Sequence, residues 1–400
     1  MSKVVLAFSA GMGTLAALHI LRRRFGRNNV VTYTANLGQK SSTEGLCERA
    51  TQGGAAYAHI ADLRARFITD YVWPALRAGA VCESGYALAH ALARPLIVSE
   101  VIRVAREEGA DFIAHGCAGK SNDQVRFEIS AAALAPDLGV LAPLREQGLL
   151  HRDEISGYCQ RHGLPTNVDE CRFSITENVY GSSVQWPRAP DPFQDVPEDA
   201  YRLTASETEA PDEAVEVLVS FQQGLPSAID GEPLGPVALV EAISKIAGAH
   251  GVGRLTTLED RLIGIKMLEV YEQPAATVLH EARRALERLV LAPDLAQFKA
   301  IVSSRYAELA YQGFWFSELR ESLDAFVVKS AEFVTGDVRV RLHRGTCRVV
   351  GVRSRYSLYS QGLAEPNVQG DEFAGQDGVQ GYMKTLTQSL RQSELSKRAR

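Results

Sequence analysis

Residues 3–39 of the chain read KVVLAFSAGMGTLAALHILRRRFGRNNVVTYTANLGQ. An apolar run over Lys3–Phe8 leads into a loop of small residues, Ser9–Gly13, and apolar residues then recur at the spacing of a helix. A second apolar run, Val30–Ala35, follows. The stretch therefore predicts a strand, a tight loop, a helix and a second strand. Such a loop offers backbone N–H groups and the positive end of a helix to a phosphate group.

The same alternation continues to about residue 165 and predicts an α/β fold, a parallel sheet covered by helices on both faces. Glycine and polar residues follow the apolar runs, which would place a ligand along the carboxyl edge of the sheet. The further strands expected here lie at Ala55–Ile60, Asp111–His115 and Gly139–Leu141, and the long helices at Tyr86–Glu108 and about His151–Arg161.

Past Pro165 the pattern favours an α+β fold, after a proline-rich and acidic crossing at Gln185–Asp199. We predict three parts: residues 1–165, residues 166–365, and a polar helical tail over 366–400 that is too thin to fold alone and could pack on a partner subunit. The antiparallel strands expected in the second part lie at Ala214–Phe221, Val338–Leu342 and Arg348–Val352, and the helices at Pro236–His250, Ala275–Leu291 and Ser317–Val334.

The composition is that of an ordinary globular protein, with 46% apolar and 23% charged residues. A net charge of −5 argues against a nucleic-acid partner, and the sequence has no apolar run long enough to span a membrane. Six scattered cysteines contain no CxxC pair, so we expect no zinc or redox centre. Their scatter, and the absence of a signal-peptide pattern, lead us to expect reduced thiols in a cytoplasm.

Taken alone, the first loop leaves its ligand open. Gly11-x-Gly13-x-x-Ala16 fits a dinucleotide fingerprint, but the acid that should follow the second strand is replaced by Asn36. A Walker P-loop is excluded because no Gly-Lys-Ser/Thr follows. A tight turn that needs small residues and binds nothing remains the alternative.

A second candidate loop, residues 115–128, reads HGCAGKSNDQVRFE and predicts a strand end, a glycine turn and a helix start. Asn122 and Asp123 are natural helix caps, and Arg126 alone would usually be a solvated charge. Together with Lys120 they favour an amino-acid-like ligand, because guanidinium pairs with a carboxylate and Asp123 suits an ammonium group.

Two more clusters, Phe173–Ser183 and Gly251–Lys266, mix hydroxyl groups, acids and glycines. Singly, each is more typical of a turn with capping serines than of a site.

Three longer sequence segments that contain or accompany these clusters match one known family. The chain resembles the argininosuccinate synthase family, a member of the PP-loop (N-type) ATP pyrophosphatases, from Lys3 to about Leu390. The blocks that carry the resemblance are AHGCAGKSNDQVRFE (114–128), GVGRLTTLEDRLIGIKMLEVYEQPAATVL (251–279) and SLYSQGLA (357–364).

The resemblance implies a Rossmann-like nucleotide domain of the adenine nucleotide alpha hydrolase type, a synthetase domain and a C-terminal oligomerisation helix of a homotetramer. It also implies a reaction. ATP, with Mg²⁺, activates the ureido oxygen of citrulline as an adenylate and releases pyrophosphate, and the amine of aspartate then displaces AMP. Such chemistry needs groups that position the reactants rather than a strong general base.

Site residues are carried over by motif, with Asn122, Asp123 and Arg126 at the reacting centre and no residue assigned to a metal. The ATP loops run over Ala7–Leu15 and include Ala7, Phe8, Ser9, Gly11, Thr14, Ala35 and Gly116. The citrulline pocket keeps Tyr86, Asn122, Arg126, Ser174, Ser183, Glu259 and Tyr271, the aspartate pocket keeps Asn122 and Asp123, and the amine-donor side also holds His90, Ala91 and Ala118.

The sequence departs from the family at several of these positions. The family's first loop, S-G-G-L-D-T-S, is here SAGMGTL (9–15), which replaces a glycine by Ala10, an acid by Gly13 and a hydroxyl by Leu15. The loss of two phosphate-contacting groups costs about 3–6 kcal/mol at ~1.5–3 kcal/mol each. The other departures are Asn36 and Thr176 for acids, Ala118 for threonine, and His90-Ala91 for Thr-Ser.

These changes cluster at the ATP loop and the aspartate side, which favours specialisation over decay. The alternatives to the ligase are a diverged paralogue that uses another amine or carbonyl substrate, and a catalytically silent citrulline-binding protein. If the loop merely decayed, restoring it with Gly13→Asp and Leu15→Ser should raise turnover. If the loop was retuned for another task, the same change should do little or harm.

Overall fold

The computed structural model describes residues 2–39, 45–83, 85–117, 119, 121–165, 173–186, 191–364 and 375–398. The chain forms two compact units, residues 1–356 and residues 357–400. No described helix is long and apolar enough to cross a membrane.

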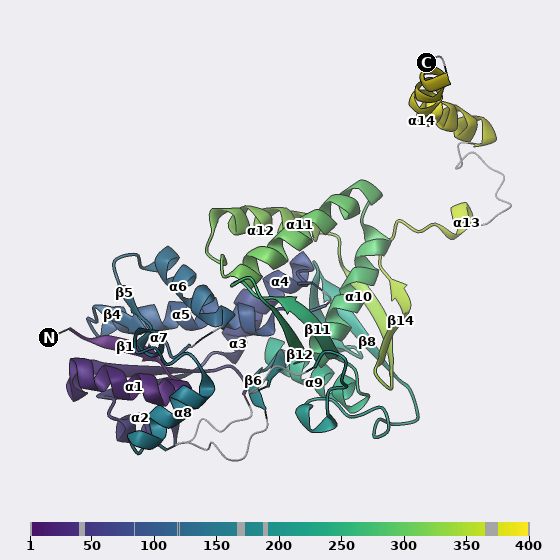
Figure 1. Ribbon diagram of the computed structural model, residues 1–400. Coiled ribbons are helices and arrows are strands. Elements are labelled where there is room, and N and C mark those ends of the chain that lie inside the picture. Colours follow the sequence, from purple (N-terminus) through teal and green to yellow (C-terminus); the bar gives the residue numbers. More distant parts are fainter. Residues whose placement is uncertain are drawn as a thin grey trace. The chain divides into compact units, whose positions relative to one another are not determined.

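A five-stranded parallel sheet opens the first unit, as the sequence predicts (Figure 1). Its strand order, β3-β2-β1-β4-β5, reverses direction at β1, so the loops after β1 and β4 flank the point where a ligand binds in sheets of this kind. The strands are β1 (Val4–Ala7), β2 (Val30–Asn36), β3 (Tyr57–Asp62), β4 (Phe112–Ala114) and β5 (Gly139–Leu141).

Both faces of this sheet are buried under helices. Val4 and Leu6 pack in one cluster with Leu18 of the first helix, whereas Val5 packs in another with Leu92 on the opposite face. This alternation follows from the two-residue period of a strand. The helical segments are α1 (Met12–Phe25), η1 (Arg27–Asn29), α2 (Leu46–Gly53), α3 (Arg64–Phe67), the π-helical turn η2 (Ile68–Val72), α4 (Trp73–Ala78), α5 (Ala89–Glu107), α6 (Asn122–Leu134), α7 (Pro143–Glu146) and α8 (Arg152–Arg161).

The helix expected over Tyr86–Glu108 begins later, at Ala89. Tyr86 instead pairs with Cys82 in a short β-bridge. Leu88 has a φ of 63°, a left-handed conformation that cannot be part of a right-handed helix. The Tyr86 hydroxyl accepts a hydrogen bond from the His90 N–H at 3.0 Å, so it satisfies one of the free donors at the start of α5.

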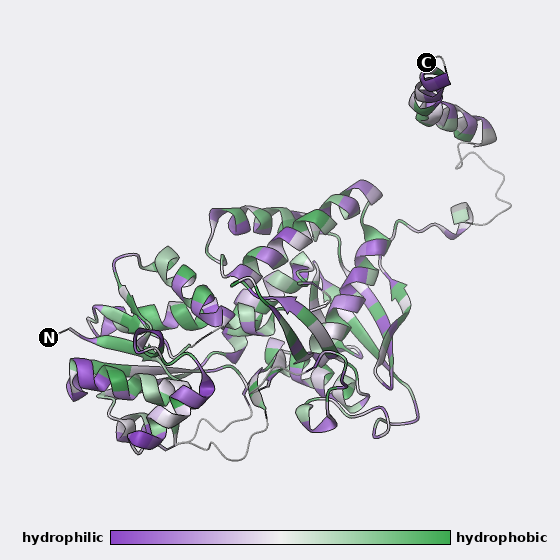
Figure 2. Ribbon diagram, in the orientation of Figure 1, coloured by the Kyte–Doolittle hydropathy of each residue, from purple (hydrophilic) through white to green (hydrophobic). Residues whose placement is uncertain are grey.

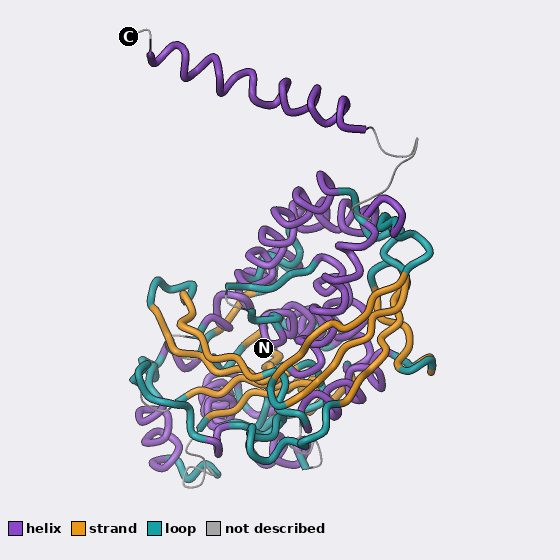
Figure 3. The backbone as a smooth tube through the Cα atoms, turned by 90° about the vertical axis from the view of Figure 1, so that its right-hand side faces the viewer, coloured by secondary structure: helices purple, strands orange, loops and turns teal. Residues whose placement is uncertain are grey.

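Two antiparallel sheets follow, and Figure 3 shows their strands side by side. The clusters at Phe173–Ser183 and Gly251–Lys266, expected singly to be turns with capping serines, are largely strands. That expectation was wrong because the hydroxyl residues sit on extended, paired backbone. The first of these sheets has the order β10-β9-β8-β13-β14 and the second β11-β12-β7-β6. Their strands are β6 (Ser174–Asn178), β7 (Gly181–Gln185), β8 (Val215–Gln222), β9 (Leu225–Ile229), β10 (Glu232–Pro233), β11 (Arg254–Asp260), β12 (Lys266–Glu272), β13 (Gly336–His343) and β14 (Thr346–Arg353).

The helices of this later part include one that the sequence analysis missed, α11, which begins at Pro293. The core is continuous across the first unit, because one cluster of buried side chains includes both Val5 and Leu342. Figure 2 shows helices of mixed hydropathy, with hydrophilic and hydrophobic residues on the same ribbon. The boundary at residue 165 stays a prediction. The helical segments are η3 (Glu198–Ala200), α9 (Pro236–Ala249), α10 (Pro274–Val290), α11 (Pro293–Gln312) and α12 (Glu318–Ser330).

The second unit contains α13 (Gln361–Ala364) and α14 (Gly375–Arg398). Tyr382, Leu386 and Leu390 of α14 are each more than half exposed. The tail's role in oligomerisation stays a prediction.

Candidate active site

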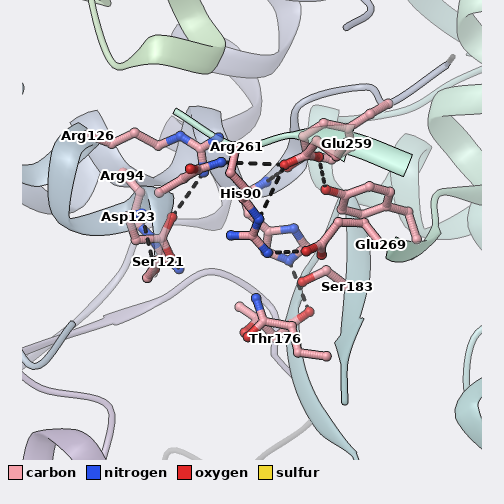
Figure 4. Close-up of a pocket in the computed structure, with 14 residues that line it drawn as sticks. His90, Arg94, Ser121, Asp123, Arg126, Thr176, Ser183, Glu259, Arg261 and Glu269 are labelled. Carbon is pink, nitrogen blue, oxygen red and sulfur yellow. Dashed lines mark hydrogen bonds and ion pairs between the residues drawn. The ribbon is translucent and has the colours of Figure 1, made fainter. Parts of the chain in front are cut away.

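A buried pocket forms where α5, the start of α6 and the strands β6, β7, β11 and β12 meet (Figure 4). Three positions in register across neighbouring strands contribute to it: Thr176 pairs with Ser183, and Ser183 pairs with Tyr271. Residues in register on adjacent strands project on the same face of a sheet. We call this the amino-acid pocket.

Asp123 sits between two guanidinium groups in this pocket. Arg94 Nη2 donates to one carboxylate oxygen at 2.7 Å, and Arg126 Nη1 donates to the other at 3.1 Å. Burial opposes ionisation, but the Arg94 and Arg126 charges outweigh it and hold the pKa of Asp123 well below its usual range. Asp123 is therefore a carboxylate at neutral pH.

The helix cap of α6 is Ser121, not Asn122 or Asp123 as the sequence suggested. The Ser121 hydroxyl accepts the Asp123 N–H at 3.2 Å. Because Ser121 serves as the cap, the side chains of Asn122 and Asp123 remain available to the pocket. Arg126, the next turn along, is 5% exposed, which excludes the alternative that it is a solvated surface charge.

Asn122 and Glu259 are joined through Tyr311, a residue of α11. The Tyr311 hydroxyl donates to Glu259 Oε1 at 2.5 Å and accepts from Asn122 Nδ2 at 2.8 Å. Tyr271 donates to the other oxygen of Glu259. A buried carboxylate bound by two hydroxyl groups is held in one orientation.

The same tyrosine positions Arg126. Arg126 Nε donates to the Tyr311 carbonyl at 2.7 Å, and the guanidinium lies 4.8 Å from the centre of the Tyr311 ring. Sequence reasoning missed Tyr311 because it lies in an unpredicted helix, outside every motif.

Three further charged residues of the pocket were also missed. Arg94 lies one turn after His90 on α5, and Arg261 pairs with Glu269 in the interior. Burial raises the pKa of Glu269 to about 7, against the opposing effect of Arg261. The available signals were the i, i+4 spacing from His90 and the strand alternation of Glu269 with Tyr271.

The remaining predicted residues divide by position. Tyr86 stacks on Tyr271 with ring centres 4.0 Å apart, and His90 and Ser183 line the pocket. Ala91 is buried on α5 and does not belong to the described lining. Ala118, Lys120 and the side chain of Ser174 lie outside the described residues.

The first loop and the Gly116 turn meet at the carboxyl edge of the parallel sheet, as expected. We call Ser9–Thr14 the phosphate loop. The Thr14 hydroxyl donates to the Gly11 carbonyl at 3.0 Å and lies 3.4 Å from the Ser9 hydroxyl. A Cβ on Gly116 would lie 2.8 Å from the Thr14 methyl group, so the two turns are in tight contact.

Other residues that were predicted to bind ATP lie at the carboxyl ends of β1 and β2. Ala7 ends β1, Phe8 N–H donates to the Tyr33 carbonyl at 2.8 Å, and Ala35 lies near the end of β2. Asn36 Oδ1 accepts the Gly38 N–H at 3.0 Å. An amide here lacks the carboxylate that holds the ribose of a dinucleotide, which disfavours the dinucleotide alternative.

Comparison with known proteins assigns the fold to a family. Residues 3–165 match the family model described as the arginosuccinate synthase N-terminal HUP domain, and residues 173–393 match the arginosuccinate synthase C-terminal domain. This chain belongs to the argininosuccinate synthase family.

Relatives in this family are similar over almost the whole chain. An argininosuccinate synthase from Synechococcus sp. (strain JA-3-3Ab) is 45% identical over 372 residues, which are 93% of this chain and 92% of the relative. One from Symbiobacterium thermophilum is 46% identical over 364 residues, 90% of each chain. One from Chlorobium phaeobacteroides is 44% identical over 363 residues, again 90% of each.

Against the argininosuccinate synthase loop pattern, the three substitutions have distinct structural settings. Ala10 has a φ of 55°, a left-handed conformation that glycine adopts more easily. A Cβ on Gly13 would lie 2.9 Å from the Gly116 carbonyl oxygen, so the space for an acidic side chain is closed. Leu15 is 7% exposed and packs with Leu18 in the core rather than into the loop.

The phosphate loop leads into backbone N–H groups that have no partner within the helix. Helix α1 begins at Met12, and its first N–H groups have no acceptor within the helix. With Gly13 in place of an acid, the loop itself supplies no carboxylate, and the described residues contain no cluster of three metal-binding side chains.

Proposed function

We propose that this chain is an ATP-dependent, AMP-forming carbon–nitrogen ligase that joins citrulline to aspartate. The observation that carries the proposal is the amino-acid pocket. It brings Arg126, Glu259 and Tyr271 from separate segments to one buried site beside Asn122 and Asp123. Membership of the argininosuccinate synthase family supports the same reaction.

The charge of each pocket residue indicates which substrate group it binds. Glu259, held by two tyrosine hydroxyls, suits the ammonium group of citrulline, and Arg126 suits its carboxylate or ureido oxygen. Asp123, kept ionised by its arginines, suits the amine of aspartate. The ureido oxygen bonds to the α-phosphorus of ATP as pyrophosphate leaves. The amine then forms the C–N bond as the carbon–oxygen bond to AMP breaks, and the proton of the amine passes to solvent.

The phosphate loop and the Gly116 turn hold the phosphates of ATP against the N-terminus of α1. Mg²⁺, when bound to those phosphates, supplies the charge neutralisation that pyrophosphate departure requires. All of these groups act by positioning the reactants and by electrostatic stabilisation, since the reaction needs no covalent bond to a side chain.

We further propose a homotetramer, in which the exposed apolar residues of α14 pack on another subunit, and a cytoplasmic location. The five described cysteines are free thiols, which suits a reducing compartment. Sedimentation of the full chain beside a version ending at residue 356 tests the first point, because loss of the tail should lower the mass of the assembly.

The decisive experiment mixes the chain with ATP, Mg²⁺, citrulline and aspartate, and measures AMP and pyrophosphate. Each component is omitted in turn, and a panel of other amines replaces aspartate. Both products should appear when citrulline and an accepted amine are present together. Their absence under every combination contradicts the proposal.

A second candidate, a diverged ligase with another amine, is favoured by the imidazole at position 90 on the amine-donor side. In that case another amine of the panel should outcompete aspartate. The silent citrulline-binding alternative requires calorimetric binding of citrulline with no turnover of ATP.

A further inference from the structure

His90 places an imidazole in the wall of the amino-acid pocket, near the start of α5 (Figure 4). Its Nε2 lies 3.0 Å from the Thr176 carbonyl oxygen on β6. A backbone carbonyl can only accept a hydrogen bond, so Nε2 must carry the ring proton. That bond fixes the orientation of the ring and its tautomer.

The other ring nitrogen is then an acceptor without a donor. His90 is 6% exposed, and Nδ1 is buried with no partner among the residues that the structure describes. Burial, reinforced by the Arg94 charge, lowers the pKa of His90 to about 4, so the ring is neutral at pH 7. Buried polar atoms in proteins nearly always have a partner, which suggests that Nδ1 meets its donor on a ligand.

The neighbours of His90 indicate which ligand. Arg94 lies four residues along α5, on the same face of the helix, and pairs with Asp123. The Asp123 carboxylate also acts electrostatically on the imidazole. His90 is therefore linked to Asp123 both by its charge and through Arg94, the pair to which we assign the second substrate.

We propose that Nδ1 of His90 accepts a hydrogen bond from the attacking amine of the second substrate, and so orients its nitrogen. This rests on the proposed ligase. An amine supplies the N–H that Nδ1 lacks, and with one N–H held there and Asp123 beside it, the nitrogen lone pair is directed at the activated carbon. A carboxylate oxygen at this position would face the Nδ1 lone pair and be repelled.

Two substitutions separate this contact from the bond to Thr176. His90→Gln keeps a donor near the Nε2 position but places no acceptor where Nδ1 was. His90→Asn does the reverse, because its side-chain oxygen branches from the same carbon as Nδ1. The two variants are thus matched controls for each other. Circular dichroism and thermal melting of both establish that they fold.

Two measurements on the full chain test the proposal. The first is citrulline-dependent ATP–pyrophosphate exchange, which needs no amine. The second is kcat/KM for aspartate. We expect His90→Gln to keep the exchange and the KM for citrulline within about twofold and to lose roughly 10- to 100-fold in kcat/KM for aspartate. His90→Asn should retain more aspartate activity than His90→Gln.

The outcomes distinguish the proposals. If the wild-type chain shows no exchange, the ligase function falls and this inference with it. If exchange occurs but His90→Gln leaves kcat/KM for aspartate unchanged, only the inference is overturned. It is also overturned if His90→Asn is the more damaging variant, or if the KM for citrulline moves instead, since the Thr176 bond or the first substrate would then explain the effect.

Discussion

The amino-acid pocket and the phosphate loop lie in the same compact unit but are built in opposite ways. The pocket uses long side chains from distant segments, with Arg126, Asn122 and Glu259 connected through Tyr311. The loop uses backbone N–H groups and small residues close together in the sequence. A site made of side chains fails when one partner is lost, whereas a site made of backbone fails mainly when its conformation or its space changes.

The largest effect should come from the pocket, at Arg126. Arg126→Ala removes a buried guanidinium that binds Asp123 and the Tyr311 carbonyl. Loss of one partner of a buried ion pair costs about 3–5 kcal/mol, because the remaining groups stay buried. We expect loss of citrulline-dependent exchange and a lower free energy of unfolding in urea.

The matched control for that variant is Arg145→Ala. Arg145 pairs with Glu128 at 2.7 Å, but its side chain is 46% exposed, so its removal should cost no more than about 1 kcal/mol. Equal losses at Arg126 and Arg145 would contradict the distinction between a buried side-chain network and its surroundings.

The next largest effect concerns restoration of the loop with Gly13→Asp and Leu15→Ser. The sequence alone led us to expect higher turnover if the loop had merely decayed, and little change or harm if it had been retuned for another task. The structure gives a physical reason for the second outcome. Leu15 is a core residue, and replacing a buried leucine by a small polar residue costs about 2–5 kcal/mol. An acid at position 13 must also displace the Gly116 carbonyl oxygen.

We therefore expect the double variant to be less stable in urea and no more active in AMP release. Leu15→Ser alone serves as the control, because it separates the loss of core packing from the crowding at Gly13. Higher turnover with unchanged stability would show that the loop has only decayed.

A smaller effect is expected at Tyr311, whose hydroxyl links Asn122 to Glu259. Tyr311→Phe leaves two buried polar groups without that partner, at about 1–3 kcal/mol. The KM for citrulline should rise by roughly tenfold, since Glu259 would lose its fixed orientation. The control is Tyr306→Phe on the same helix, because that hydroxyl binds Asp324 at 2.8 Å instead. A similar rise in KM for both variants would remove the positioning role.

The same contrast between the phosphate loop and the pocket explains which features could be predicted from the sequence. Each strand of the parallel sheet and the phosphate loop is specified by a short local pattern, and these strand and loop signals were read correctly. The pocket depends on contacts between distant segments. Tyr311 lies 52 residues from Glu259 and 189 from Asn122, and a local sequence pattern does not predict contacts over such separations.

Local context also explains two wrong expectations. Serine and threonine residues at 173–183 and 251–266 indicate turns by propensity, but strand pairing overrides propensity there. The capping role assigned to Asn122 and Asp123 belongs to Ser121, because three polar residues in a row left the helix start ambiguous. Both ambiguities fell on residues of the pocket, where side chains serve a ligand as well as the fold.

The smallest effect should come from Ala10 in the phosphate loop. With a φ of 55°, its methyl group is strained by about 1 kcal/mol relative to glycine, and Ala10→Gly relieves that strain. The greater freedom of glycine in the unfolded chain offsets part of the gain, so we expect a rise of no more than about 1 kcal/mol in unfolding free energy. The control is Ala132→Gly on the exposed side of α6, where the same change should destabilise by about 1 kcal/mol. Opposite signs for the two variants would show that the loop is limited by its backbone conformation. If both variants are destabilised equally, the left-handed conformation carries no strain, and the methyl group must affect the loop only through the space it takes from the phosphates.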